Sequence, residues 1–293
     1  FHTNSIAWDG TQPPGSRGIS LETVRQGFAA FNEVSGASEV GVWVADSDYV
    51  AINELDVTNN SVGLAILGTH DVYLNGVRGI NNAVGVAIMR TPAHPGPANN
   101  YVMEFSGMFN NNQDNDAPDS SELAGLPSGT GLLLLGVDQF EVRSSSFEAN
   151  HGFGLALFSH HDEHFGDSEA EFSALSTNTW IHDNRFLGNG KDPSGLADLF
   201  AVFGTIEAIT WDGCAAPGGA SNAGNCFLNN VELDDGPNKQ PIGAATIVNL
   251  HLCDGDDPSY GGALITCQGT PPPGLPELAG TEENPGGEGG EGG

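Results

Sequence analysis

Apolar residues recur along this chain in a glycine-led tetrad, Gly-apolar-X-apolar, with a period of about 22 residues. The copies begin at Gly18, Gly41, Gly63, Gly85, Gly131 and Gly154. Within one copy Val42 and Val44 fall on one side and Trp43 on the other, which is typical of a β-strand with one buried face. Units of this length cannot bury an apolar face alone and must stack. The pattern therefore predicts a β-solenoid.

A second strand is predicted in each unit, because the segments that follow two tetrads superpose with a shift of about 22 residues. Val50, Ile52, Asn53, Leu55, Asn59 and Asn60 fall on Val72, Leu74, Asn75, Val77, Asn81 and Asn82. Asn and Gly favour the left-handed conformations of sharp turns, and stacked Asn side chains can bond to one another along an axis. Three short strands joined by such turns would fill one coil.

Insertions between the tetrads predict a groove over the outward face of the first strand. Segments 89–100 and 159–179 follow a first strand, and segment 110–128 precedes one, so they would form walls on its two edges. The inward columns that start from Ile19 and Leu21 would form the core. The predicted groove floor and walls consist of Trp43, Ala65, Ala87, Leu133 and Ala156, with His94 and His160 in the walls.

Segments 41–60 and 63–82 match a repeat of the form G-I-x-L…N-x-I…N-x-x. This chain therefore resembles the pectin-lyase-like family of right-handed parallel β-helix repeat proteins. From Gly36-Ala37-Ser38 through Gly190, with Gly129-Thr130-Gly131 and Trp211-Asp212-Gly213, it is similar to secreted bacterial β-helix repeat proteins whose function is not established. The resemblance covers roughly residues 18–213. It implies an all-β, right-handed parallel β-helix, and in the family's enzymes the groove holds extended sugar chains. It implies no single activity, because this fold hosts lyases, hydrolases, epimerases, adhesins and inert scaffolds.

Three regions are expected: coils over 1–190, a cysteine-containing C-terminal region over 191–269, and a disordered Pro/Gly/Glu tail over 270–293. The four cysteines are Cys214, Cys226, Cys253 and Cys267. None forms a CxxC pair, so zinc is a poor fit. We favour the pairs Cys214–Cys226 and Cys253–Cys267, because each closes a short Gly-rich loop. Disulfides predict a secreted, periplasmic or cell-surface protein, and the absence of Met at Phe1 suggests a processed or truncated N-terminus.

The formal net charge of −30 makes binding to a nucleic-acid backbone very unlikely. No run of 18 apolar residues is present, so no transmembrane segment is predicted. The acidic surface is compatible with cation binding, with solubility in salty surroundings, or with no charged partner. Anionic polysaccharides would be repelled unless calcium bridged them, so calcium is the one cofactor considered. A monomer is expected.

The densest candidate site is the loop His160-His161-Asp162-Glu163-His164. Such a cluster can bind a transition metal or supply an acid and a base, and a solvated polar loop is the alternative. The catalytic candidates are His161, Asp162, His164, Arg90 and Arg143, because lyases and epimerases of this fold need a base beside a neutralised carboxylate. The metal candidates are His160, His164 and Asp162, with Asp46, Asp48 and Asp71 as a calcium ladder or as turn-forming residues.

The sequence thus favours an extracellular scaffold that binds a carbohydrate or cell-surface component through the strand-one groove. A polysaccharide lyase or C5-epimerase-type enzyme is the alternative, and a purely structural surface protein is the third. The apolar floor predicted for the groove favours binding over catalysis.

Overall fold

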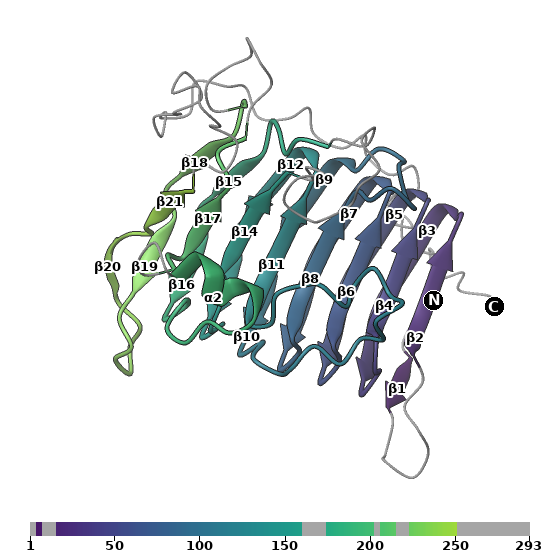
Figure 1. The fold of residues 1–293 in the computed structure, drawn as a ribbon, viewed down its shortest axis with the longest axis horizontal. Coiled ribbons are helices and arrows are strands. Elements are labelled where there is room, and N and C mark those ends of the chain that lie inside the picture. The colour runs from purple at the N-terminus through teal and green to yellow at the C-terminus, as the bar shows by residue number, and fades with distance from the viewer. Residues whose placement is uncertain (1–3, 8–15, 160–173, 202–205, 215–222, 251–293) are drawn as a thin grey trace, which may run out of the picture.

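The computed structural model describes residues 4–7, 16–159, 174–201, 206–214 and 223–250. Its strands stack side by side along one axis, and almost every neighbouring pair is parallel (Figure 1). The chain forms a parallel β-helix, which confirms the fold predicted from the repeat.

The tetrads form one eight-stranded sheet. In order it contains β2 (Arg17–Glu22), β4 (Val40–Ala45), β6 (Val62–Leu67), β8 (Val84–Met89), β11 (Thr130–Leu135), β14 (Leu155–Phe158), β17 (Ile209–Trp211) and β21 (Ile247–Asn249). The predicted register holds: Leu64 pairs with Val42 and Val86, and Leu132 pairs with Val86 and Leu155. We call this sheet the tetrad sheet.

The remaining strands form a bent sheet of thirteen strands that makes the other sides of each coil. The first strands are β1 (Ser5–Ala7) and three long ones, β3 (Arg25–Ser35), β5 (Asp48–Thr58) and β7 (His70–Ile80). From the next coil each long strand is replaced by two short ones, and β7 pairs with both β9 and β10. The short strands are β9 (Asn99–Glu104), β10 (Gly107–Phe109), β12 (Asp138–Arg143), β13 (Ser146–Glu148), β15 (Trp180–His182), β16 (Arg185–Leu187), β18 (Cys226–Leu228) and β19 (Val231–Leu233). An antiparallel strand, β20 (Pro241–Ala244), pairs with β19.

The inward-facing columns of both sheets meet in one hydrophobic core. Leu64, Val86 and Leu132 are fully buried there. Aromatic rings stack from coil to coil within the core, with Phe147 and Phe186 at a centroid distance of 4.9 Å. Burial of each large apolar side chain contributes about 1.5–3 kcal/mol, so the stack is stabilised coil by coil.

A ladder of buried asparagines runs along the stack, as the Asn columns predict. Each side-chain amide donates to the side-chain carbonyl of the next Asn at 2.9–3.1 Å, in the order Asn60, Asn82, Asn111, Asn150 and Asn189. The preceding residues Asn59, Asn81 and Asn110 have φ of 55°, 55° and 52°, in the left-handed region that Asn tolerates. The ladder satisfies buried amides at a turn where the backbone cannot continue its sheet pairing.

Parallel pairing continues past residue 190, further than the sequence pattern indicates. Strand β14 pairs with β17 and β17 with β21, while β15 pairs with β18 and β16 with β19. Strand β17 lacks the leading glycine of a tetrad. Ala208 occupies the position that corresponds to Gly154 in the preceding coil. The helix α2 (Leu196–Ala201) belongs to an insertion between β16 and β17.

The described part of the chain holds no helix that is long and apolar enough to cross a membrane. The predicted tail 270–293 lies outside the described residues, as do Cys253 and Cys267. Neither Cys214 nor Cys226 is a free thiol, and the pairing suggested above stays a prediction.

Candidate functional site

The predicted groove floor is buried. Its side chains, Trp43, Ala65, Ala87, Leu133 and Ala156, are at most 3% exposed. Apolar residues of the 110–128 insertion, of α2 and of the segment after α2 pack on them, among them Leu123, Ala197 and Ile206. Figure 1 shows α2 and the teal loop before β11 lying in front of the tetrad sheet. The expectation of an open groove here is wrong, because the insertion covers the face instead of flanking it.

The physical reason lies in the composition of these strands. Positions on both sides of the pleat are apolar, so β8 and β11 are buried at every residue. Strands with both faces buried have nearly continuous apolar sequences. The outward side chains form a second hydrophobic cluster with their cover, separate from the core of the coils.

His94 and Asp46 meet at the edge of this covered face. His94 Nδ1 lies 2.8 Å from Asp46 Oδ2, and its Nε2 lies 3.3 Å from Glu122 Oε1. The His94 ring meets the Trp43 ring edge-on at a centroid distance of 5.7 Å, and the Arg17 guanidinium stacks over that indole at 3.8 Å. His94 therefore connects Asp46, which follows β4 of the tetrad sheet, to Glu122 of the covering segment 110–128. Trp43 is enclosed by Arg17 and His94 as well as by the apolar residues that cover the sheet.

The imidazole ring of His70 lies between the carboxylates of Asp48 and Asp71. His70 Nε2 lies 2.7 Å from Asp48 Oδ1, and His70 Nδ1 lies 2.8 Å from Asp71 Oδ2. Since Asp46 is paired with His94, the three aspartates do not converge as a ladder. Within the described ranges there is no group of three or more His, Cys, Asp or Glu residues placed to hold a metal ion.

Of the remaining candidates, His160, His161, Asp162 and His164 lie outside the described residues. The side chain of Arg90 donates from Nε to the Pro95 carbonyl at 2.9 Å, at the edge of the tetrad sheet. Arg143 lies on β12 of the thirteen-stranded sheet and not beside the tetrad groove.

Arg143 is the centre of a polar row that crosses four coils. The register pairs Asn75 of β7 with Glu104 of β9, Glu104 with Arg143 of β12, and Arg143 with His182 of β15. Two residues earlier in each strand, a parallel row contains Tyr73, Val102, Glu141 and Trp180. Phe105 follows Glu104 at the bend of the sheet. We call the outward residues of these two rows, together with Phe105 and Asp183, the polar face.

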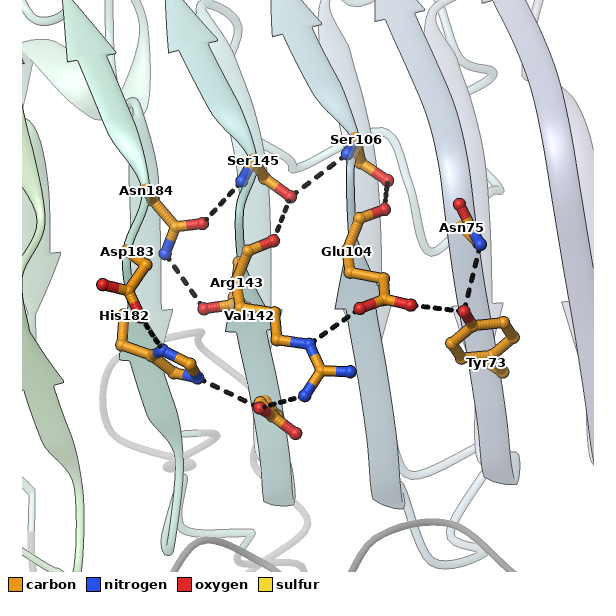
Figure 2. A network of polar contacts seen from close by, with 11 residues as sticks. Tyr73, Asn75, Glu104, Ser106, Val142, Arg143, Ser145, His182, Asp183 and Asn184 are labelled. Carbon is orange, nitrogen blue, oxygen red and sulfur yellow. Dashed lines mark hydrogen bonds and ion pairs between the residues drawn. The ribbon is translucent and has the colours of Figure 1, made fainter. Parts of the chain in front are cut away.

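Hydrogen bonds and ion pairs link the polar face from coil to coil (Figure 2). Arg143 donates from Nε to Glu104 Oε2 at 2.7 Å and from Nη1 to Glu141 Oε1 at 2.8 Å. The Tyr73 hydroxyl donates to Glu104 Oε1, and His182 Nε2 lies 3.0 Å from Glu141 Oε1. The third guanidinium nitrogen of Arg143 has no partner among the described residues and carries no dashed line in Figure 2.

Burial and neighbouring charges shift the pKa values of several groups of the face. Both ring nitrogens of His182 lie against carboxylates, with Nε2 3.0 Å from Glu141 Oε1 and Nδ1 2.6 Å from Asp183 Oδ2. The hydrogen bond from His182 is the main cause that lowers the pKa of Asp183. Burial, and then the hydrogen bond and charge of Glu104, raise the pKa of Tyr73, so its hydroxyl stays a donor. Burial lowers the pKa of the Arg143 guanidinium, but the glutamates on either side of it raise that pKa overall.

The face divides into an accessible layer and a supporting layer. The Phe105 side chain is 64% exposed and the Arg143 side chain 38% exposed. Glu104, Glu141 and His182 are nearly buried beneath them, and the Trp180 ring stacks on His182 at 3.8 Å. A ligand would therefore touch Arg143 and Phe105, while the residues below hold the guanidinium in place.

Sequence reasoning identified Arg143 but missed Tyr73, Glu104, Glu141 and His182. Glu104 and Arg143 are 39 residues apart in the sequence, as are Arg143 and His182, because insertions separate these coils. The 22-residue period does not align them. The available signal was the alternation of polar and apolar residues in 138–143, which marks a strand with one solvent-facing side.

No protein-family model matches this chain, and no curated protein matches it. Among solved structures, the A-module of the mannuronan C-5 epimerase AlgE6 from Azotobacter vinelandii is similar, with 12% sequence identity and a TM-score of 0.45. The match covers 80% of this chain and 54% of the other, so the chain spans about half the length of that module.

Proposed function

We propose that this protein is an extracellular β-helix scaffold that binds a glycan or another cell-surface component through the polar face. The observation that carries the proposal is the hydrogen-bonded row across four coils, with the exposed ring of Phe105 beside it. Aromatic rings pack against the apolar faces of sugars, and planar polar side chains bond to their hydroxyls. The row runs along the axis of the stack, which suits an extended chain.

Pre-organisation supports binding at this place. Arg143 is held by two glutamates on different strands, and those strands belong to a continuous sheet. A side chain that is already immobilised loses little conformational entropy when a ligand arrives. The supporting residues, Glu104, Glu141 and His182, are therefore positioning residues for Arg143.

Location outside the cytoplasm is part of the same proposal. Cys214 and Cys226 are buried and not free thiols, and disulfides persist in oxidising compartments. A strongly acidic surface keeps such a protein soluble and monomeric.

A lyase or epimerase is the second candidate, because the exposed face carries Arg, Tyr and His together. Both reactions need a base that removes a proton next to a carboxylate. Tyr73 stays protonated, both ring nitrogens of His182 are engaged by carboxylates, and Arg143 is a cation. Glu104 and Glu141 already accept hydrogen bonds from these groups. The resting geometry thus presents no free base and favours binding over proton abstraction.

The test is retention of the purified protein on a panel of immobilised neutral and acidic glycans, with calcium and with chelator. Arg143→Gln and Phe105→Ala should weaken retention, the latter by up to about tenfold for loss of a stacking ring. Arg78→Gln is the matched control. Arg78 lies on β7, is 55% exposed and pairs with Asp56, outside the polar face.

Loss of retention in both polar-face variants but not in Arg78→Gln would support the proposal. No retention of the wild type, or equal retention by Arg143→Gln, would contradict it. Release of unsaturated or reducing ends in the same incubations, abolished by Arg143→Gln, would favour the enzyme instead. Thermal unfolding of each variant shows whether it is folded.

A further inference from the structure

We infer that the ligand of the polar face is an uncharged, hydroxyl-rich glycan, and that glycans whose sugars carry carboxylates are rejected. The inference rests on the proposed function and specifies its ligand class. It follows from the charges and the unused hydrogen-bonding positions of the polar face.

The guanidinium of the face is already neutralised. Arg143 is paired with Glu104 and Glu141, and the two ring nitrogens of His182 lie against Glu141 and Asp183. Among these described residues three carboxylates face one guanidinium and one imidazole. A ligand carboxylate that reached the third guanidinium nitrogen would meet one positive charge and two negative charges within the same few ångströms.

Neighbouring charges do not change this balance. On the same strands Asp71 and Asp138 precede the polar face, and Asp71 is bonded to His70. Arg78 of β7 is paired with Asp56. The whole chain carries a formal net charge of −30, which repels an anionic polymer at longer range.

The unused positions of the face match a hydroxyl group. Arg143 offers the NH2 group of its third nitrogen as a free donor. Asn75 donates from its amide to the Tyr73 hydroxyl at 3.0 Å, which leaves its side-chain carbonyl as an acceptor. A sugar hydroxyl both donates and accepts, so it can bond to either group, whereas a carboxylate only accepts and would face the Asn75 carbonyl without a proton.

The experiment compares polymers of the same backbone with and without carboxylate charges. Polygalacturonate is compared with its fully methyl-esterified form, and C6-oxidised cellulose with cellulose, each with calcium and with chelator. We expect tighter binding of the uncharged member by on the order of tenfold, with the difference shrinking as salt screens the repulsion. Equal or tighter binding of the carboxylated member, in either condition, overturns the inference.

Charge-neutralising variants make the same test from the protein side. Glu141→Gln and Glu104→Gln each remove one carboxylate beside Arg143, so each should improve binding of the carboxylated member relative to the uncharged one by on the order of tenfold. Using both variants covers the case in which one fails to fold. Asp192→Asn is the matched control, since its side chain is 85% exposed and lies outside the polar face. It should leave the preference unchanged.

The outcomes separate the two proposals. Binding of the carboxylated polymers that depends on Arg143 and equals or exceeds that of the uncharged ones would overturn the inference and leave the glycan-binding function standing. Absence of binding to every polymer of the panel would overturn both.

Discussion

The outward faces of the two sheets differ although the same coils build them. The outward side of the tetrad sheet, from Trp43 to Ala156, is apolar and covered by an insertion and a helix. The outward side of β7, β9, β12 and β15 carries Tyr73, Glu104 and Arg143, with Arg143 and Phe105 accessible. Both faces belong to sheets of parallel strands, so backbone geometry does not decide which of them is covered and which stays accessible.

An insertion beside a sheet face of a solenoid can flank that face or cover it. The composition of the insertion and of the face beneath it decides which of the two occurs. Segment 110–128 contains Ala117 and Leu123, and the face beneath offers alanines and leucines, so the two bury each other. No such partner is available to a row of linked charges, whose desolvation would be costly.

The largest expected effect comes from a charge placed on the covered face. Ala87→Asp would bury an unpaired carboxylate at a fully buried position, at a cost of about 3–5 kcal/mol, enough to unfold a marginally stable domain. Leu228→Asp is the matched change, because Leu228 is 39% exposed and pairs in register with His182. It should cost less than about 1 kcal/mol. Chemical denaturation measures the free energy of unfolding of the two variants. Similar losses of stability would contradict the distinction between a covered and an accessible face.

Removal of the Trp43 side chain should separate stability from binding. Trp43→Ala deletes a ring that packs in the covered cluster and contacts Arg17 and His94, at a cost of about 3 kcal/mol. Glycan retention of the folded fraction should not change, because the ring is enclosed. Trp43→Phe serves as a milder variant if the alanine variant does not fold. Loss of retention in the phenylalanine variant at unchanged stability would restore the tetrad face as a binding surface.

The smallest effect concerns the pH dependence of the polar face. A carboxyl whose pKa is lowered on folding contributes stability above its unfolded pKa of about 3.9, and loses it as the pH falls through the lower folded value. Asp183 is such a group. Wild type should therefore exceed Asp183→Asn in melting temperature at pH 7, and the difference should vanish in strong acid.

Solvent screens this exposed pair, so the contribution is expected to be a few tenths of a kcal/mol. Asp192→Asn should show no comparable dependence. A difference between wild type and Asp183→Asn that persists unchanged in strong acid would show that Asp183 acts through packing and not through its charge.

Much of the fold could be predicted because its signals are local and periodic. The glycine-led tetrads predicted the register in which Leu64 pairs with Val86, and the Asn columns predicted the ladder through Asn82. The coils beyond residue 190 were missed, because Ala208 and the short strand β17 carry no tetrad. Their pairing depends on packing against β14 and not on a motif.

The candidate site was predictable only in part. Arg143 was identified as an arginine of the repeat region, but its position on β12 places it on another face than the expected one. The covered state of the tetrad face had a local signal, since 132–135 is a run of four leucines that leaves no polar side to the strand.

The sequence by itself determined the repeat, the inward columns and the turns, because these depend on residue types at a fixed spacing within one coil. The tertiary structure alone decided that Glu104, Arg143 and His182 meet, since insertions place each of them 39 residues from the next, well outside the 22-residue period. It also decided which outward face is covered. Coil stacking aligns residues by their place in the strand and not by their distance in the sequence, so side chains 39 residues apart become hydrogen-bonded neighbours.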